Sequence, residues 1–558
     1  EEAYRFAKGE EVLSSTGQRA RLIRPLDFLV VADHAENLGL APMIAESNPD
    51  LLKTEFGKKW HDMVNADKGY DAFIEWASSV QEGDKIKSEK MQRTVWDRQI
   101  EAAEKHNDPG RFTALIGFEW SSLNTRETPS NLHRVVIFKD GGGKAQQVIP
   151  YSAFDSQDPE DLWKWMQAYE EKFGGSILGI PHNGNLSNGL MFAVERLNGK
   201  AIDKQYAETR MRFEPIIEVT QIKGDGEAHP YLSPTDEWAN YGTWDKGDIA
   251  GVKPKQKNML QYEYARTALQ VGLSVEQEIG ANPFKFGMIG ATDAHTGLAA
   301  TREENYWGKF AGTEPAADRY EHYVIKSFSG DDSLSTFAWE EVSSGLAGVW
   351  ARENTREALF EAMQKKEVYA TTGTRITVRL FGGWDYGKDD VYRPDAVSIG
   401  YRKGVPMGGD LPKAKAGKAP VFMVGALKDP WSGNLDRIQI IKGWVDEKGR
   451  RHEKIYDVAV ADGRQIGPDG RCKTPVGNTV DEKNATYLNN IGDAELRAVW
   501  TDPDFNPKHR SVYYARVLEI PTPTWQAYDA QFYGITMPEQ VPLSHQERAY
   551  TSPIWYTP

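Results

Sequence analysis

The sequence of 558 residues contains a single cysteine, Cys472. One thiol excludes an intrachain disulfide and any metal cluster built on several thiolates. The sequence also lacks an apolar run of about 18 residues, the length that a membrane-spanning helix needs. Basic residues are in deficit, with 67 Lys and Arg against 81 Asp and Glu and a formal net charge of −14. Such a surface repels nucleic acid, so we expect no nucleic-acid binding. Because no apolar run is long enough, we also expect no membrane span.

Large apolar side chains are abundant, with 17 Trp, 24 Tyr and 21 Phe in a chain that is 40% hydrophobic. A chain of this length at roughly 150 residues per domain predicts two to four domains with ordinary packed cores. The sequence begins inside a helical pattern and without Met. We therefore expect residues upstream of Glu1 to be missing from it.

Short apolar runs alternate with longer helical patterns up to about residue 373. The predicted strands are 27–32, 114–120, 133–138, 177–181, 216–222, 287–291 and 367–370. The predicted helices between them include 94–105, 160–173, 259–273 and 354–365. The apolar runs lack strict alternation, which is typical of parallel strands covered on both faces. The first part is therefore predicted to be a parallel α/β structure, either an open sheet or a barrel.

The pattern changes near residues 374–395. Beyond this point, runs such as PVFMVGALKD, DRIQIIKGWVD and SVYYARVLEI are separated by Gly, Pro, Asn and Asp clusters. This texture predicts an antiparallel β domain. We place the two domains at residues 1–385 and 386–558. The apolar closing segment 547–558 is expected to dock on a neighbouring surface.

Histidines and carboxylates stand at the ends of the predicted strands of the first part. They are His34, Glu119, His133, His182, Asp293 and His295. Active sites form at the carboxyl edge of parallel strands, and this set of side chains suits Zn, Mn or Fe. Any one of these histidines taken alone is more often structural, but their repetition favours one shared site. The three histidines of the β domain, His452, His509 and His545, are isolated, so we expect no metal ligand from residues 395–558.

The motifs around these residues resemble a known superfamily. They are ADHAEN (32–37), GFEW (117–120), LHRVVIF (132–138), GIPHNGN (179–185) and GATDAHTG (290–297). Their order and spacing resemble the PHP (polymerase and histidinol phosphatase) metallohydrolases, and within them the bacterial DUF3604 family. RPLDFLVVADHAE, EVTQIKGDGEAHP, VYATTGTR and ERAYTSPIWYTP extend the resemblance to almost the whole chain.

The resemblance implies a distorted TIM-type (β/α)7 barrel with up to three metal ions at its carboxyl rim. It implies that Glu119 bridges two ions, with Asp293 on one of them and His133 and His182 on the other. His34 and His295 would hold the third. The opening His-x-His motif of the family is absent from the sequence, and we expect it upstream of Glu1. Without that motif, one ion would have only Glu119 and Asp293 as ligands.

Such a site predicts hydrolysis of a phosphate ester, because paired divalent ions activate water and hold a phosphoryl oxygen. Four further residues are candidates for the catalytic machinery. Asp33 could orient a ligand, Lys223 and Arg302 could hold an anion, and His229 could protonate a leaving group. For each of them, a strand-end cap or a solvated loop residue is the alternative reading.

Two other functions are compatible with the sequence. The same rim could hydrolyse an amide, a lactone or a sulfate ester, or the chain could be a noncatalytic binding protein with a degenerate barrel. The expected partner is a small anionic ester, and an oligomer is open. The family resemblance and the single cysteine favour a periplasmic or secreted protein, with the cytoplasm as the alternative.

Overall fold

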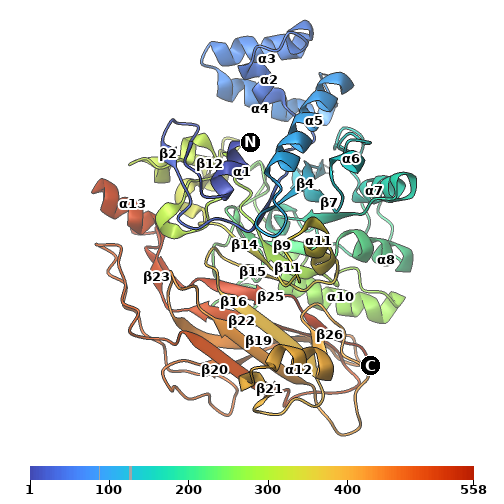
Figure 1. Cartoon of the computed structure of the whole chain (residues 1–558), viewed down its shortest axis with the longest axis vertical. Coiled ribbons are helices and arrows are strands. Elements are labelled where there is room, and N and C mark those ends of the chain that lie inside the picture. The colour runs from blue at the N-terminus through green and yellow to red at the C-terminus, as the bar shows by residue number, and fades with distance from the viewer. Residues whose placement is uncertain (87, 125–127) are drawn as a thin grey trace.

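The computed structural model describes residues 1–86, 88–124 and 128–558, and it is a mixed α/β structure (Figure 1). Among the described residues, its first part holds a four-stranded sheet, a three-stranded sheet and several two-stranded pairs. A four-stranded sheet runs in the order β3 (Phe28–Val31), β4 (Thr113–Trp120), β7 (Arg134–Phe138), β8 (Ile177–Pro181). A three-stranded sheet runs in the order β10 (Gly224–Asp225), β9 (Ile216–Gln221), β11 (Gly287–Gly290). Each of the predicted strands is present within two residues of its expected bounds.

The strand directions differ from the prediction at one strand. β3 and β4 are parallel, as are β9 and β11. β7 is antiparallel to both of its neighbours, β4 and β8. The prediction that 133–138 is a parallel strand was therefore wrong, because an apolar run carries no information about its direction. Among the described residues, hydrogen-bonded strand pairs close no barrel.

Helices lie between these strands and bury one face against them. They are α5 (Glu89–His106), α7 (Pro159–Phe173), α8 (Lys204–Phe213), α10 (Ala265–Ile279) and α11 (Arg356–Gln364). Capping sets their ends: the Asp158 carboxylate accepts from the N–H of Glu160, Pro159 occupies the first turn of α7, and Gly174 ends it in a left-handed conformation. Buried Leu162, Trp163 and Met166 of α7 join the main core.

Three helices form an extension at one end of the molecule (Figure 1). They are α2 (Leu40–Ala45), α3 (Glu55–Asn65) and α4 (Gly69–Ser79). The chain before them forms α1 (Glu2–Ala7), β1 (Val12–Leu13) and β2 (Arg19–Ala20). Short elements elsewhere are β5 (Leu123–Asn124), β6 (Ser130–Asn131), α6 (Gly142–Ala145), α9 (Lys257–Leu260), β12 (Tyr323–Ile325) and β13 (Thr336–Phe337).

The opposite end is built from two antiparallel sheets (Figure 1). The larger runs β14 (Leu346–Val349), β15 (Val368–Thr371), β25 (Arg548–Thr551), β22 (Arg510–Glu519), β19 (Leu435–Val445), β20 (Arg451–Val460), with β26 (Ile554–Tyr556) also on β22. The smaller runs β17 (Gly404–Pro406), β16 (Thr377–Gly383), β18 (Val421–Leu427), β21 (Glu495–Thr501). Val378 and Phe422 of one sheet and Ile440 and Tyr513 of the other belong to one buried core. The antiparallel β texture expected for this region is therefore present.

The two parts of the chain share the larger sheet. β15 precedes residue 385 but pairs with β25, through Ala370 and Tyr550. The closing segment docks through β25 and β26, in which Tyr550 and Trp555 are buried, as expected from its apolar content. The remaining elements are α12 (Ala396–Lys403), β23 (Thr522–Pro523), α13 (Trp525–Tyr533) and β24 (Ser544–His545).

Candidate metal centre

The four-stranded sheet brings four of the predicted ligands to one edge. Beyond the end of β3, the N–H of Ala35 donates to the carbonyl of Glu119 at 2.8 Å, which continues the pairing with β4. On the other side, the N–H of His182 lies 3.3 Å from the carbonyl of His133. Neighbouring strands, or the segments that continue them, thus place four residues at one end of the sheet: His34, Glu119, His133 and His182.

The reversed direction of β7 explains why His133 precedes its strand, whereas Glu119 lies near the end of β4 and His34 and His182 follow β3 and β8. β4 and β8 end at this edge, and an antiparallel strand between them must begin there. Arg134 pairs with Trp120 at the end of β4 and with Pro181 at the end of β8. His133 therefore meets its partners at the same rim.

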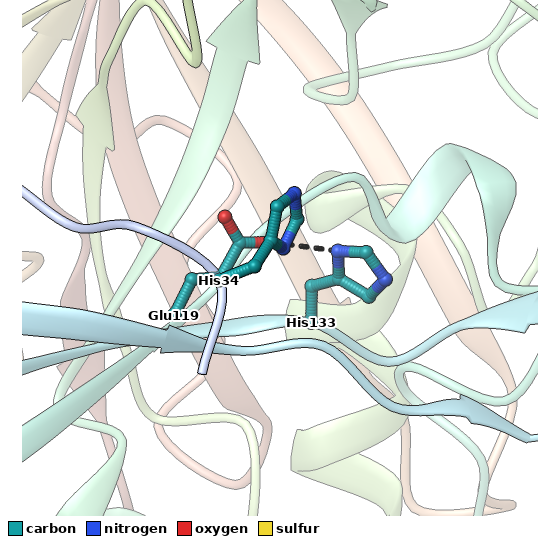
Figure 2. A group of neighbouring side chains, drawn as sticks. All are labelled: His34, Glu119 and His133. Carbon is teal, nitrogen blue, oxygen red and sulfur yellow. Dashed lines mark hydrogen bonds and ion pairs between the residues drawn. The ribbon is translucent and has the colours of Figure 1, made fainter. Parts of the chain in front are cut away.

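Glu119 is the common partner of three histidines. Its Oε1 lies 2.7 Å from His133 Nδ1, 3.1 Å from His182 Nε2 and 3.6 Å from His34 Nδ1. Figure 2 shows the imidazoles of His34 and His133 beside this carboxylate, which rises from β4. One carboxylate in contact with three imidazoles is the arrangement expected of a bridging ligand.

The second sheet supplies Asp293 and His295 from the loop after β11. The backbone of Asp293 is left-handed, with φ of 54°. Gln221, at the end of β9, donates to Asn183 Oδ1 at 2.7 Å and to Asp293 Oδ2 at 2.8 Å. His295 Nε2 lies 3.4 Å from His34 Nε2. The structure thus brings all six predicted ligands into one cluster, which we call the rim cluster.

The rim cluster has a buried floor and an open mouth. The side chains of Glu119, His133 and His182 are 6%, 7% and 2% exposed. Those of His34 and His295 are 34% and 30% exposed. A small molecule that approaches the cluster therefore meets His34 and His295 first.

Burial and charge set different protonation states in this cluster. Burial lowers the pKa of His133 to about 4, in spite of the Glu119 carboxylate beside it. His133 is thus neutral at pH 7 and keeps a lone pair for a metal ion. Burial alone would raise the pKa of Glu119, but His34, His182 and His133 together hold it well below its usual range. Glu119 is therefore an anion in this site.

Two lysines neutralise Asp293. Lys223 Nζ lies 2.6 Å and Lys309 Nζ 2.8 Å from Asp293 Oδ2. Burial would raise the pKa of Asp293, yet these two ammonium groups hold it well below its usual range. Burial lowers the pKa of Lys309 to about 7. Lys223, which is predicted to hold an anion, thus lies beside Asp293 in the rim cluster.

The donor atoms fit divalent metal ions. His34, Glu119 and His133 form one group, and Glu119, His182 and Asp293 form another, each with its ligand atoms within 4.8 Å of one another. Both groups combine imidazole nitrogens with carboxylate oxygens, the donors that Zn, Mn and Fe accept. His182 Nδ1 and His133 Nε2 are buried and have no hydrogen-bond partner among the described residues. The rim cluster could therefore hold metal ions, with Glu119 shared between two groups.

The other three catalytic candidates have different surroundings. The carbonyl of Asp33 accepts from the N–H of Glu119 at 2.8 Å, which keeps Asp33 next to the rim cluster. His229 Nε2 lies 3.0 Å from Asp245 Oδ2, and its Nδ1 accepts from the N–H of Tyr231. Arg302 donates to the carbonyl of Trp431 and lines a surface pocket with Arg24 and Arg375. The hydrogen bonds of His229 and Arg302 thus join them to groups outside the rim cluster.

Sequence reasoning missed Lys309 and Glu218. Lys309 follows a Trp-Gly pair in a loop, and no motif marks it. Glu218 lies inside the predicted strand 216–222, where alternation was absent. Burial raises the pKa of Glu218 to about 7, although His182 lowers it, and its Oε1 has no hydrogen-bond partner among the described residues. The sequence does give one signal for Glu218, because it is an isolated carboxylate within an apolar run.

Fold and site define a mixed α/β protein with a histidine and carboxylate cluster that could hold metal ions. Among the described residues, no helix has the length and apolar character to cross a bilayer. The chain belongs to the DUF3604 family, whose model, described as "Protein of unknown function (DUF3604)", matches residues 1–558. Searches of curated proteins and of solved structures found no match.

Proposed function

We propose that this protein is a metal-dependent hydrolase of the PHP type that acts on small phosphate esters. The observation that carries the proposal is the contact of one buried carboxylate, Glu119, with His34, His133 and His182. A carboxylate shared by several imidazoles suits a bridge between two divalent ions. Zn, Mn or Fe are the proposed ions, up to three per chain.

A PHP-like distorted barrel is the fold that we propose for this part of the chain. The parallel pairs β3–β4 and β9–β11 support it, as does the common rim at which the ligands of both sheets meet. The antiparallel β7 would be one source of the distortion.

When bound, divalent ions in such a site lower the pKa of water toward neutrality and hold a phosphoryl oxygen. The protein's own residues then neutralise the charge of Asp293 and orient the incoming ester. Lys223 and Lys309 balance the charge of Asp293 and add positive charge beside it. His34 and His295, at the open mouth, are placed to meet an incoming ester. The excess of cationic and neutral donors over carboxylates favours an anionic substrate.

The experiment measures metal content and phosphatase activity on the full chain. The protein is stripped with a chelator, reloaded with Zn²⁺, Mn²⁺ or Fe²⁺, and assayed with aryl phosphate mono- and diesters. Amide, lactone and sulfate-ester substrates form a parallel panel. We expect metal-dependent turnover of a phosphate ester. Turnover confined to the parallel panel would move the assignment to another hydrolase, and bound metal without any turnover would favour a binding protein.

A further inference from the structure

A second group of metal-type side chains lies outside the rim cluster. It consists of Glu303, His545 and Glu547, whose ligand atoms lie within 4.8 Å of one another. Glu303 belongs to the loop that follows Asp293 and His295, at the short helical turn Glu303–Asn305. His545 ends β24, and Glu547 precedes β25. The group therefore joins the rim-cluster loop to the C-terminal strands.

One imidazole nitrogen faces two buried carboxylates. His545 Nε2 lies 3.2 Å from Glu303 Oε1 and 3.1 Å from Glu547 Oε1. A single N–H can donate along only one of these directions. The hydrogen bond goes to Glu547, and Glu303 Oε1 is left without a hydrogen-bond partner among the described residues. Because Glu303 is 7% exposed, water cannot readily satisfy this oxygen.

The charges are unbalanced in the same way. When both carboxylates are ionised they carry −2, whereas an imidazolium supplies at most +1. The outer oxygens are already occupied: Glu303 Oε2 accepts from the N–H of Trp525, and Glu547 Oε2 accepts from Thr372 and Tyr241. These hydrogen bonds hold both inner oxygens toward His545. A third carboxylate, Glu519, is fully buried on the neighbouring strand, and its backbone N–H donates to the carbonyl of Glu547.

We propose that Glu303, His545 and Glu547 bind a divalent transition-metal ion that fastens the rim-cluster loop to the C-terminal strands. Ligands about 2.1 Å from a tetrahedral ion lie about 3.4 Å apart, close to the separations observed here. A charge of +2 balances the two carboxylates, and both inner oxygens gain a partner. One imidazole and two carboxylates suit Zn²⁺, Mn²⁺ or Fe²⁺. This proposal differs from the expectation that residues 395–558 contribute no metal ligand, and it does not depend on the hydrolase assignment.

The test uses the full chain with the rim cluster disabled by Glu119→Gln and His133→Ala. Chelator-stripped protein of this background is titrated with Co²⁺, whose visible absorption reports coordination by imidazole and carboxylates. We expect about one Co²⁺ per chain. The further change His545→Gln, which keeps a polar side chain of similar reach, should abolish this absorption. His452→Gln is the matched control, because His452 lies in the same β region but pairs with Asp446, and it should leave the absorption unchanged.

Thermal unfolding gives a second readout that does not require the His545 variant to fold. In the same background, Zn²⁺ should raise the melting temperature, and Glu303→Gln should remove this rise. Equal Co²⁺ absorption with and without His545→Gln would overturn the proposal, as would a melting temperature that Zn²⁺ leaves unchanged. Either result would show that the proton of His545, and no metal ion, joins this histidine to Glu303 and Glu547.

Discussion

Two clusters of buried charged side chains differ in how many of their polar atoms have a hydrogen-bond partner or a partner of opposite charge. The first is the rim cluster. The second, which we call the ion network, joins Glu227, Asp236, Arg266 of α10 and Arg516 of β22, and each of these side chains is at most 1% exposed. Arg516 binds Asp236 through two nitrogens at 2.9 and 2.7 Å, and Arg266 binds Glu227 at 2.8 and 3.1 Å.

In the ion network every charge has an opposite partner in a bidentate pair. In the rim cluster, one oxygen of Glu119 lies within 3.6 Å of three imidazole nitrogens. Among the described residues, the opposite ring nitrogens of His133 and His182 have no hydrogen-bond partner, although they are buried. Ion pairs in which every charge has a partner stabilise the fold, whereas polar atoms without a partner are available to bind a ligand. The comparison supports a stabilising role for the ion network and the proposed metal-binding role of the rim cluster.

The largest effect is expected from Arg516→Met. Among the described residues, this change leaves the buried Asp236 carboxylate with Arg266 as its cationic partner. Removal of one partner of a buried ion pair should lower the free energy of unfolding by about 3–5 kcal/mol. Denaturant unfolding measures the loss. Arg393→Met, which breaks an exposed pair with Asp395, is the control and should leave the free energy of unfolding nearly unchanged. A similar loss in both variants would contradict the stabilising role of the ion network.

The second prediction concerns Glu119→Gln. The amide keeps the size of the side chain but removes the charge shared by the three histidines. Metal occupancy and hydrolysis should fall together, by more than about 100-fold in turnover, since changes to mere outer partners of metal ligands already cost 10–100-fold. Elemental analysis and phosphatase assays measure both. Glu101→Gln, on the exposed face of α5, is the control. Full activity of Glu119→Gln would refute the proposed centre.

The third prediction is a pH dependence of the ion network. Burial would raise the pKa of Asp236, but Arg516 and Arg266 hold it far below its usual range. A carboxylate with a depressed folded pKa stabilises the fold above its unfolded pKa of about 3.9 and loses this contribution as the pH falls. The free energy of unfolding should therefore drop below about pH 5. In Asp236→Asn the slope should be shallower by up to about 1.4 kcal/mol per pH unit. Parallel slopes in the two proteins would exclude this contribution.

The smallest effect is expected from His229→Gln. His229 bonds to Asp245 and Tyr231, and its ring packs against Tyr264. We expect unchanged metal occupancy by elemental analysis. A loss of metal comparable with that of Glu119→Gln would show that His229 belongs to the rim cluster after all.

Much of the fold could be predicted because burial leaves a direct mark on composition. Runs such as ILGIP of β8 were located to the residue, since a strand covered on both faces must be apolar. The direction of a strand leaves no such mark on the composition, so the reversed direction of β7 could not be predicted from the sequence. The six rim ligands could be found because each stands where an apolar run meets a loop. Lys309 could not, because its role depends on a loop that returns to Asp293 from 16 residues away.

The larger sheet has a consequence for synthesis of the protein. β15 ends at Thr371, whereas its partner β25 begins only at Arg548. As the chain emerges from the ribosome, β15 must wait for the synthesis of residues 548–551 before this partner exists. Until then, β15 and β22 both expose unpaired backbone edges to other chains. A ribosome that stops before the codon of Arg548 therefore releases a protein with an incomplete sheet, whose open strand edges favour aggregation.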